Sequence, residues 1–503
     1  MNIYKIYKNN YYIFFIFIFI FPLLRYLPQL FDGVLLDYAF AVERLDYIEP
    51  WYKDVIRYFH FYIIVLITKL SALLHISEEL IIDLLSATFL ALFCYETKKY
   101  SKLFFKLDKH WCNLAAFFTA IFPVWHTLVS FNISEYLFSF YCVLFGYRNF
   151  LNKKIYNKLI GIFFIIISFE IESNLSFVIG LSLIHILIST GRKDDEITLK
   201  FFLSIILISF SYYFLKIKYF PTTGYWATYN ELNINLLSNL SIQNLIKNIF
   251  NYLTFLIAFI WLPLLLFFKK TNSKISFKQF YFNEYFLLIL LSAFAIFPYL
   301  LLNKYTYIYH LADYFQRHAF LLGPIFGIFF AKVFSDINDY KLFKVKNYIK
   351  YNLLIFIILN LTLLSYGFLR KTESFHFRHH LVEQLKTHGE IPKGNVNIIT
   401  KNQPADLRIF EVSHLLFKAY GSASWFGYIT KSEHELDLSY IFHGKNIEDE
   451  QGYLHLNILA DYKPECKSYI YLKNDLNKIN RFKKFYVFNY KKYYLIDEIS
   501  LKC

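Results

Sequence analysis

Glycine, proline, methionine and cysteine are scarce in this chain of 503 residues, which contains 15, 11, 1 and 5 of them. It has no Gly-rich phosphate loop and no dinucleotide-binding fingerprint, so a nucleotide-activated substrate held by such a motif is not expected. The cysteines show no metal-ligand spacing. Cys94, Cys112 and Cys142 lie in apolar sequence and are expected in the core. A disulfide between Cys466 and Cys503 is an option only if the polar C-terminal part lies outside the cytoplasm.

Apolar residues are abundant and are grouped in long blocks. The chain is 56% hydrophobic and 22% aromatic, with a mean hydropathy of +0.36. Blocks of this length without amphipathic spacing are typical of transmembrane helices. The sequence therefore predicts an α-helical polytopic membrane protein. The blocks lie at 11–31, 57–75, 79–96, 112–130, 133–147, 158–170, 175–189, 200–217, 248–268, 284–303, 317–333 and 351–369.

The formal net charge of +15 would suggest a nucleic-acid partner in a soluble protein. Here Lys and Arg form short clusters between the apolar blocks, as the positive-inside rule requires, so we expect no nucleic-acid partner. The clusters that mark the cytoplasmic side are 98–109, 148–158, 192–193, 269–278 and 332–350. Threading from these clusters places four loops on the outer side, together with everything after residue 370. The four loops are 131–135, 170–174, 218–247 and 304–316.

The start of the chain has one apolar block too many for this threading. Residues 30–54 should be outside and Lys98 inside, yet two blocks lie between them. Residues 57–77 carry Lys69 at their centre, which suits an interfacial or re-entrant helix better than a crossing. The prediction is roughly eleven transmembrane helices, within a range of about 9 to 13. The N-terminus is expected in the cytoplasm, because the first block lacks a small-residue cleavage site and is typical of a retained span.

The composition changes after residue 370. Residues 370–503 combine helix-like segments such as FRHHLVEQLKTHG and VSHLLFKAYG with strand-like segments. They predict a small soluble α/β domain outside the cytoplasm. The strand-like segments are NVNIIT, LRIFEV, SYIYL, FYVFNY and KYYLID. Residues 1–369 are predicted to form the transmembrane domain, with an acidic first outer loop at 32–56 and the interfacial helix at 57–77.

Three carboxylates on the predicted outer side stand out. Asp32 lies at the exit of the first block, and Asp37 lies in the apolar sequence VLLDYAFAV. Glu135 lies between two apolar blocks. A carboxylate against an apolar wall can act as a general base. The alternative for each is an ordinary solvated loop residue, which is how we interpret the acids from Glu43 onward.

Basic residues gather in another outer loop, NKYTYIYHLADYFQRHAF. Arg317 opens an apolar block and suits a phosphate, because a guanidinium binds phosphate oxygens in a bidentate manner. The alternative is an interfacial anchor. His310 and His318 lie nearby in the sequence. A further outer loop, SFEIESN, offers two more acids inside apolar sequence, Glu170 and Glu172.

The order of these features resembles the N-terminal half of the type C (GT-C) membrane glycosyltransferases. A basic N-terminus and one span precede an acidic outer loop, a surface-lying segment, a span with a basic turn, and the helical pair LAAFFTAIFPVWHTLVSFNISEYLFSFYCVLFGYRNFLNKK. The later YFQRHAFLLGPIFGIFFAKVF is similar to the family's segment in which an Arg precedes a Pro-containing span. The likeness is closest to bacterial relatives of protein mannosyltransferases and aminoarabinose transferases. The likeness covers roughly residues 1–190 and 305–335, and it lies in the order and hydrophobic spacing of the segments.

The resemblance implies transfer of a hexose or pentose from a polyprenyl-phosphate-linked donor to a glycan, lipid or protein acceptor on the outer face. It implies that Asp32 or Asp37 is the essential catalytic carboxylate and that Glu135 assists it. Arg317, with His318 or His310, would hold the lipid phosphate. The family's paired Asp-Glu is absent, and its His-Pro-Pro sequence stands here as His60-Phe61-Tyr62.

No metal site is predicted from the spacing of acids. Some members of the resembled family use a divalent cation, and Asp32, Asp37 and Glu135 offer suitable oxygen ligands. We expect an integral protein of a bacterial inner membrane with its C-terminal domain in the periplasm. The alternatives are a flippase or transporter of lipid-linked glycans, an O-antigen polymerase or ligase, and a non-enzymatic anchor. A transporter would place charge in mid-span, which the blocks after residue 110 hardly do.

Overall fold

The structure is a computed structural model in which the chain forms two compact units. The first includes Leu45–Gly367 and the second includes Phe368–Cys503. In the first unit the structure describes residues 49, 52–53, 56–75, 78–125, 131–192, 195–221, 246, 284–301, 314–339, 353–365 and 367. In the second unit it describes five strands between 395 and 502. Asp32, Asp37, His310, Cys466 and Cys503 lie outside the described residues, as do the blocks at 11–31 and 248–268.

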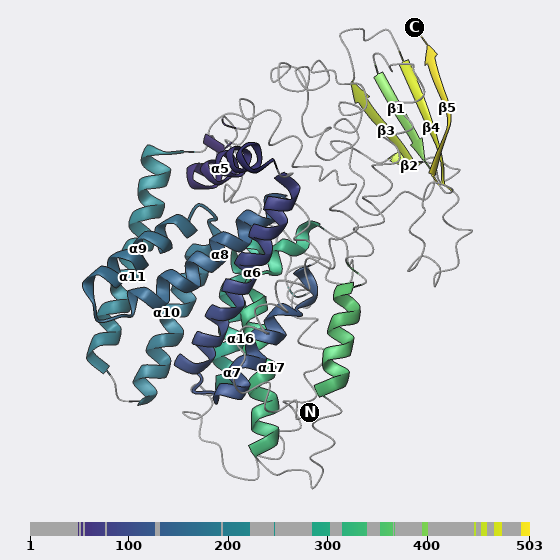
Figure 1. The fold of residues 1–503 in the computed structure, drawn as a ribbon. Helices are drawn as coiled ribbons and strands as arrows, with labels where there is room; N and C mark the ends of the chain where they lie inside the picture. The colour runs from purple at the N-terminus through teal and green to yellow at the C-terminus, as the bar shows by residue number, and fades with distance from the viewer. Residues whose placement is uncertain are drawn as a thin grey trace. The chain divides into compact units, whose positions relative to one another are not determined.

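The first unit is a bundle of helices (Figure 1). Its elements are α5 (Tyr58–Leu74), α6 (Glu78–Leu103), α7 (Lys109–Ala120), α8 (Phe131–Phe150), α9 (Ile155–Ser168), α10 (Ser173–Arg192), α11 (Asp195–Tyr219), α16 (Glu284–Leu301), the 3-10 helix η3 (Tyr314–Ala319) and α17 (Leu322–Asp339). Helix α6 packs on α7 and α8, while α17 packs on α7. Helix α8 pairs with α9, and α10 lies between α11 and α16.

Two described helices are long and apolar enough to cross a membrane, at Leu199–Tyr219 and Glu284–Leu301. Four shorter apolar helices accompany them: Tyr58–Leu74, Ile155–Ser168, Ser173–Ser189 and Leu353–Ser365. The described part of the first unit is thus largely helical, with two candidate spans. The full count of roughly eleven crossings stays a prediction.

Two of the predicted blocks are not single helices. In the described part of the block at 112–130, the helix ends at Ala120, because Pro123 follows and residues 123–125 form a short 3-10 turn. The block at 317–333 is divided between η3 and α17. Pro324 lies in the first turn of α17, where it is tolerated because the first amides of a helix have no partner within the helix.

The described strands of the second unit form one mixed sheet in the order β2-β3-β1-β4-β5. They are β1 (Asn395–Thr400), β2 (Ile447–Glu448), β3 (Leu454–Leu459), β4 (Lys467–Asn474) and β5 (Tyr494–Lys502). Strand β1 runs parallel to β4 and antiparallel to β3. The strand-like segments NVNIIT, SYIYL and KYYLID lie in or overlap β1, β4 and β5, whereas LRIFEV and FYVFNY fall outside the described residues. The predicted helices of this domain also fall outside them, so its α/β class stays a prediction.

Charged pairs tie helix ends together at the end of the bundle away from the first turn of α8. Arg148 binds Glu96 in a bidentate manner, with Nε–Oε2 at 2.6 Å and Nη2–Oε1 at 2.9 Å. The hydrogen bonds with Glu96 raise the pKa of the Arg148 guanidinium. Lys332 contacts Glu284 at 3.0 Å and Asp336 at 2.6 Å, which joins α17 to α16. These residues border basic clusters that the sequence assigns to the cytoplasmic side.

Helices α8 and α9 contact each other at two glycines, Gly146 of α8 and Gly161 of α9. A Cβ added at Gly161 would lie 2.4 Å from the backbone nitrogen of Phe150 and 2.7 Å from the carbonyl oxygen of Gly146. Close approach of small residues is a common way for helices to associate in membranes, because van der Waals packing replaces the hydrophobic effect there. The two helices can therefore hold this separation only while both positions remain glycine.

We predict that Gly161→Ala lowers the thermal stability of the full chain in detergent. Helix propensity alone would favour alanine by about 1 kcal/mol. The backbone clash should outweigh this, with a net loss of about 1 to 3 kcal/mol. The control is Leu159→Ala, because the Leu159 side chain is 61% exposed on the same helix. A higher melting temperature for Gly161→Ala would contradict the close contact of α8 with α9.

Candidate functional site

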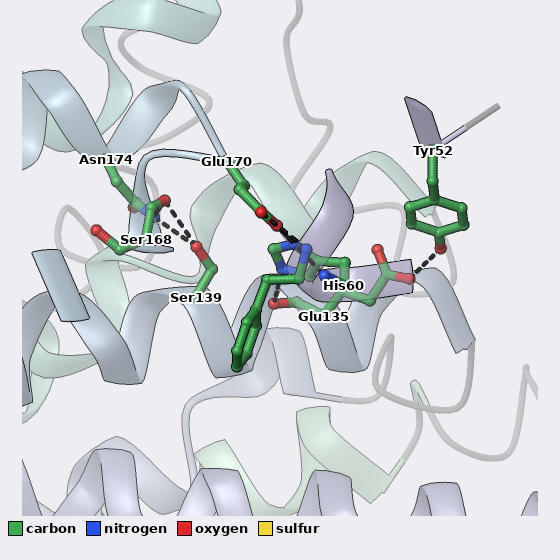
Figure 2. A network of polar contacts seen from close by, with 8 residues as sticks. Tyr52, His60, Glu135, Ser139, Ser168, Glu170 and Asn174 are labelled. Carbon is green, nitrogen blue, oxygen red and sulfur yellow. Dashed lines mark hydrogen bonds and ion pairs between the residues drawn. The ribbon is translucent and has the colours of Figure 1, made fainter. Parts of the chain in front are cut away.

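Glu135 lies near the start of α8 and is 4% exposed. Its carboxylate accepts a hydrogen bond from the Tyr52 hydroxyl (Figure 2). The charges of Arg57 and Glu170 also act on it. A buried carboxylate is costly unless it is hydrogen-bonded and balanced by positive charge. The surroundings of Glu135 are therefore those of a carboxylate that has a functional role or that forms a structural link between helices.

His60 is fully buried and lies between two acidic residues (Figure 2). Its Nδ1 is 2.5 Å from Oε2 of Glu170, and its Nε2 is 3.3 Å from the carbonyl oxygen of Glu135. The edge of its ring meets the face of Phe138 at a centroid distance of 6.3 Å. The imidazole thus connects α5 to α8 and to the turn between α9 and α10.

Glu170 also caps the start of α5. Its carboxylate accepts hydrogen bonds from the backbone amides of Phe59 at 2.9 Å and His60 at 3.3 Å. The residue at the N-cap position, Arg57, makes no side-chain cap hydrogen bond. The first amides of a helix need acceptors and favour negative charge, and Glu170 supplies both from a distant part of the chain.

A buried hydrogen-bond network holds the turn that carries Glu170 (Figure 2). Ser139 of α8 donates to the carbonyl oxygen of Ser168 at 2.8 Å. Asn174 donates to Ser139 Oγ at 2.9 Å and to the same carbonyl at 2.8 Å. All three residues are fully buried. The turn is thus fixed to α8 one helical turn below Glu135.

Two guanidinium groups contact Tyr136, the residue after Glu135. The Cζ of Arg57 lies 5.7 Å from the ring centroid, and the Cζ of Arg317 lies 5.6 Å from it. Arg317 is 7% exposed and comes from η3. Both distances fall within the range of cation–π contacts. One carboxylate and two arginines therefore lie together at the start of α8.

His318 lies beside Arg317 in sequence but has a different neighbour. Its ring stacks on Tyr299 of α16 at 4.3 Å, and the Tyr299 hydroxyl is 2.8 Å from Ser173 Oγ. In the turn between α9 and α10, Glu172 forms an ion pair with Lys216 near the end of α11. These contacts link the ends of α10, α11 and α16 to the segment that carries Arg317 and to the turn that carries Glu170.

Of the six site residues predicted from the sequence, the structure describes three. Arg317 contacts Tyr136, the residue after Glu135, and His318 stacks on Tyr299. The other three, Asp32, Asp37 and His310, lie outside the described residues. Across the part of the chain that is described, no group of three or more His, Cys, Asp or Glu is placed to hold a metal ion.

Sequence reasoning did not assign roles to Arg57, His60 or Glu170. Arg57 and His60 open the segment predicted to lie at the interface, and Glu170 lies in an otherwise apolar loop. Charged or polar residues at these positions are unusual because the surrounding sequence is apolar. Their partners could not be identified, because His60 and Glu170 are 110 residues apart and meet only in the folded chain.

Comparisons of the chain with protein-family models, with curated proteins and with solved structures give no match.

We predict that the face of the Tyr136 ring, more than its hydroxyl, holds the two arginines. Tyr136→Leu should lower the free energy of unfolding by about 2 kcal/mol or more, since two desolvated cation–π contacts are lost. Tyr136→Phe keeps the ring face and should cost clearly less. Thermal unfolding of both variants in the same detergent measures the difference. Equal losses would show that the hydroxyl is what matters.

Proposed function

We propose that the protein is a membrane-integrated glycosyltransferase that uses a polyprenyl-phosphate-linked sugar. The observation that carries the proposal is that the buried carboxylate Glu135 is next in sequence to Tyr136, whose ring lies 5.6 Å from the Cζ of Arg317. The resemblance assigns Glu135 to the second acid and Arg317 to the phosphate-holding cation. A carboxylate and a guanidinium at the same end of the bundle are the arrangement that such a reaction needs.

The chemistry requires two kinds of group. The acceptor hydroxyl or amine loses its proton to a carboxylate as it attacks the anomeric carbon. The bond between that carbon and the phosphate oxygen breaks, and the lipid phosphate leaves with the electron pair. A guanidinium stabilises the charge on the leaving phosphate. We assign proton removal to Asp32 or Asp37 with help from Glu135, and phosphate binding to Arg317 with His318 or His310.

The arrangement of helix ends supports this assignment. Glu135, Glu170 and Arg317 border three loops that the sequence places on the outer side, and contacts through Tyr136 and His60 gather them at one end of the bundle. Arg148 lies 13 residues after Glu135 on α8, which is about 20 Å along the helix. The candidate site and the Glu96–Arg148 pair thus occupy opposite ends, as a lipid-phosphate site at one membrane surface requires.

The finer features of the proposal follow from the same threading. They are roughly eleven spans, an N-terminus in the cytoplasm, a bacterial inner-membrane location and a periplasmic α/β domain. The acceptor is a glycan, lipid or protein on the outer face. A divalent cation held by Asp32, Asp37 and Glu135 is an optional part of the mechanism.

We predict that Glu135→Gln lowers the rate of donor cleavage by about 100-fold or more, because general acid–base help contributes factors of this size. The glutamine retains an acceptor for the Tyr52 hydroxyl, so the fold should persist. The assay follows release of polyprenyl phosphate from a polyprenyl-phosphate-linked hexose by the purified full chain in nanodiscs, with water as the acceptor that takes up the hexose. Glu49→Gln is the control, because Glu49 is an exposed acid paired with Lys53. Unchanged cleavage by Glu135→Gln would overturn the role of Glu135.

We predict that Arg317→Ala removes the preference for a phosphate headgroup. The wild-type protein should bind a polyprenyl monophosphate more tightly than the uncharged polyprenol of the same chain length. In the variant this difference should fall by about tenfold or more, since a bidentate charged contact is lost. Arg317→Lys should restore part of it. Equal binding of both lipids by the wild-type protein would contradict the phosphate site.

A further inference from the structure

A stretch of nine residues, from Tyr52 to His60, holds Glu135 by both its side chain and its main chain. Tyr52 donates its hydroxyl proton to the carboxylate, while His60 Nε2 lies 3.3 Å from the carbonyl oxygen. Between them the chain turns sharply, and Ile56 has a φ of 59°. A left-handed conformation is unfavourable for a β-branched residue and persists only where surrounding contacts enforce it. The position of this stretch therefore decides where the Glu135 carboxylate lies.

One residue outside this stretch anchors it. Glu170 receives three donors: the amides of Phe59 and His60 and the Nδ1 of His60. Helix α5 has no acidic residue in its first turn and no cap from its own N-cap side chain. In the described part of the chain, Glu170 is thus the carboxylate that joins the start of α5 to the turn between α9 and α10.

We propose that Glu170 is a positioning residue that acts through His60 to hold the Glu135 carboxylate in place for sugar transfer. This inference rests on the proposed function. Glu170 does not contact Glu135 by a hydrogen bond in the described structure; apart from its charge, which also acts on Glu135, its effect passes through the His60 ring and through the start of α5. Loss of one carboxylate oxygen leaves at least one of the three donors, the amides of Phe59 and His60 and the ring nitrogen, without its acceptor. The stretch that grips Glu135 then loses its fixed position.

The neighbouring acid provides a matched comparison. Glu172 lies two residues further along the same turn and forms an ion pair with Lys216 of α11. The two glutamates therefore share their surroundings and type but differ in the helix that they hold. A general loosening of the turn should follow from changing either one, whereas an effect on α5 and Glu135 should follow from changing Glu170 alone.

The experiment compares Glu170→Gln with Glu172→Gln in the full chain in nanodiscs. Glutamine has one oxygen acceptor in place of two, so it cannot receive all three donors. Amide exchange of the peptide spanning 57–62 should rise by about tenfold in Glu170→Gln, since a hydrogen bond to a charged group is lost. The rate constant kcat for cleavage of a polyprenyl-phosphate-linked hexose should fall by about 100-fold with little change in KM, as misplaced catalytic groups cause. Glu172→Gln should show neither change.

Two substitutions of His60 separate the cap from the link to Glu135. His60→Asn keeps a donor near the place of Nδ1, facing Glu170, but removes the group at Nε2. Amide exchange at 57–62 should stay as in the wild type, while kcat should still fall. His60→Gln places a donor near Nε2 and should recover part of kcat. These variants retain the test if Glu170→Gln fails to fold.

The outcomes distinguish the inference from the function on which it rests. Full kcat in Glu170→Gln with an active wild-type protein would overturn the positioning role and leave the proposed function intact. Raised amide exchange with unchanged kcat would reduce Glu170 to a helix cap. No donor cleavage by the wild-type protein would overturn the proposed function and, with it, the positioning role.

Discussion

The burial of charge at the ends of apolar helices is the constraint on which this structure depends. A carboxylate such as Glu135 can be buried only if hydrogen bonds and opposite charge surround it. Tyr52, His60 and Arg57 meet this requirement from one stretch of chain, and Arg317 from another stretch contacts the neighbouring ring of Tyr136. The start of α5, the start of α8, the turn before α10 and η3 must therefore converge at one place.

The other end of the bundle satisfies the same constraint in a simpler way. There Glu96 and Arg148 form a bidentate pair in which each group serves the other. At the start of α8 the carboxylate instead faces several donors and cations from separate segments. An ion pair whose two charged groups satisfy each other is suited to a structural link between helices. A carboxylate next in sequence to a tyrosine ring that contacts two arginines suits a reaction in which charge moves between an acceptor and a leaving phosphate.

Much of the helical layout could be predicted, because apolar blocks reveal helices even where their ends are uncertain. Glu135 and Arg317 could be selected because each is a charge at the edge of an apolar block. The role of Glu170 could not, since its partners lie 110 residues away and no local pattern records a cap supplied by another part of the chain. The break of the block at 112–130 follows from Pro123, whose effect an apolar count does not capture. Asp32 and Asp37 remain predictions.

The most direct test of the central claim is a cryo-EM structure of the full chain in nanodiscs that contain a polyprenyl monophosphate. We expect the phosphate within about 3 Å of the Arg317 guanidinium, at the end of α8 that carries Glu135. We also expect the lipid chain to enter between helices from the side. A phosphate bound at the Glu96–Arg148 end, or one bound away from Arg317 and Glu135, would show that the proposed site is wrong.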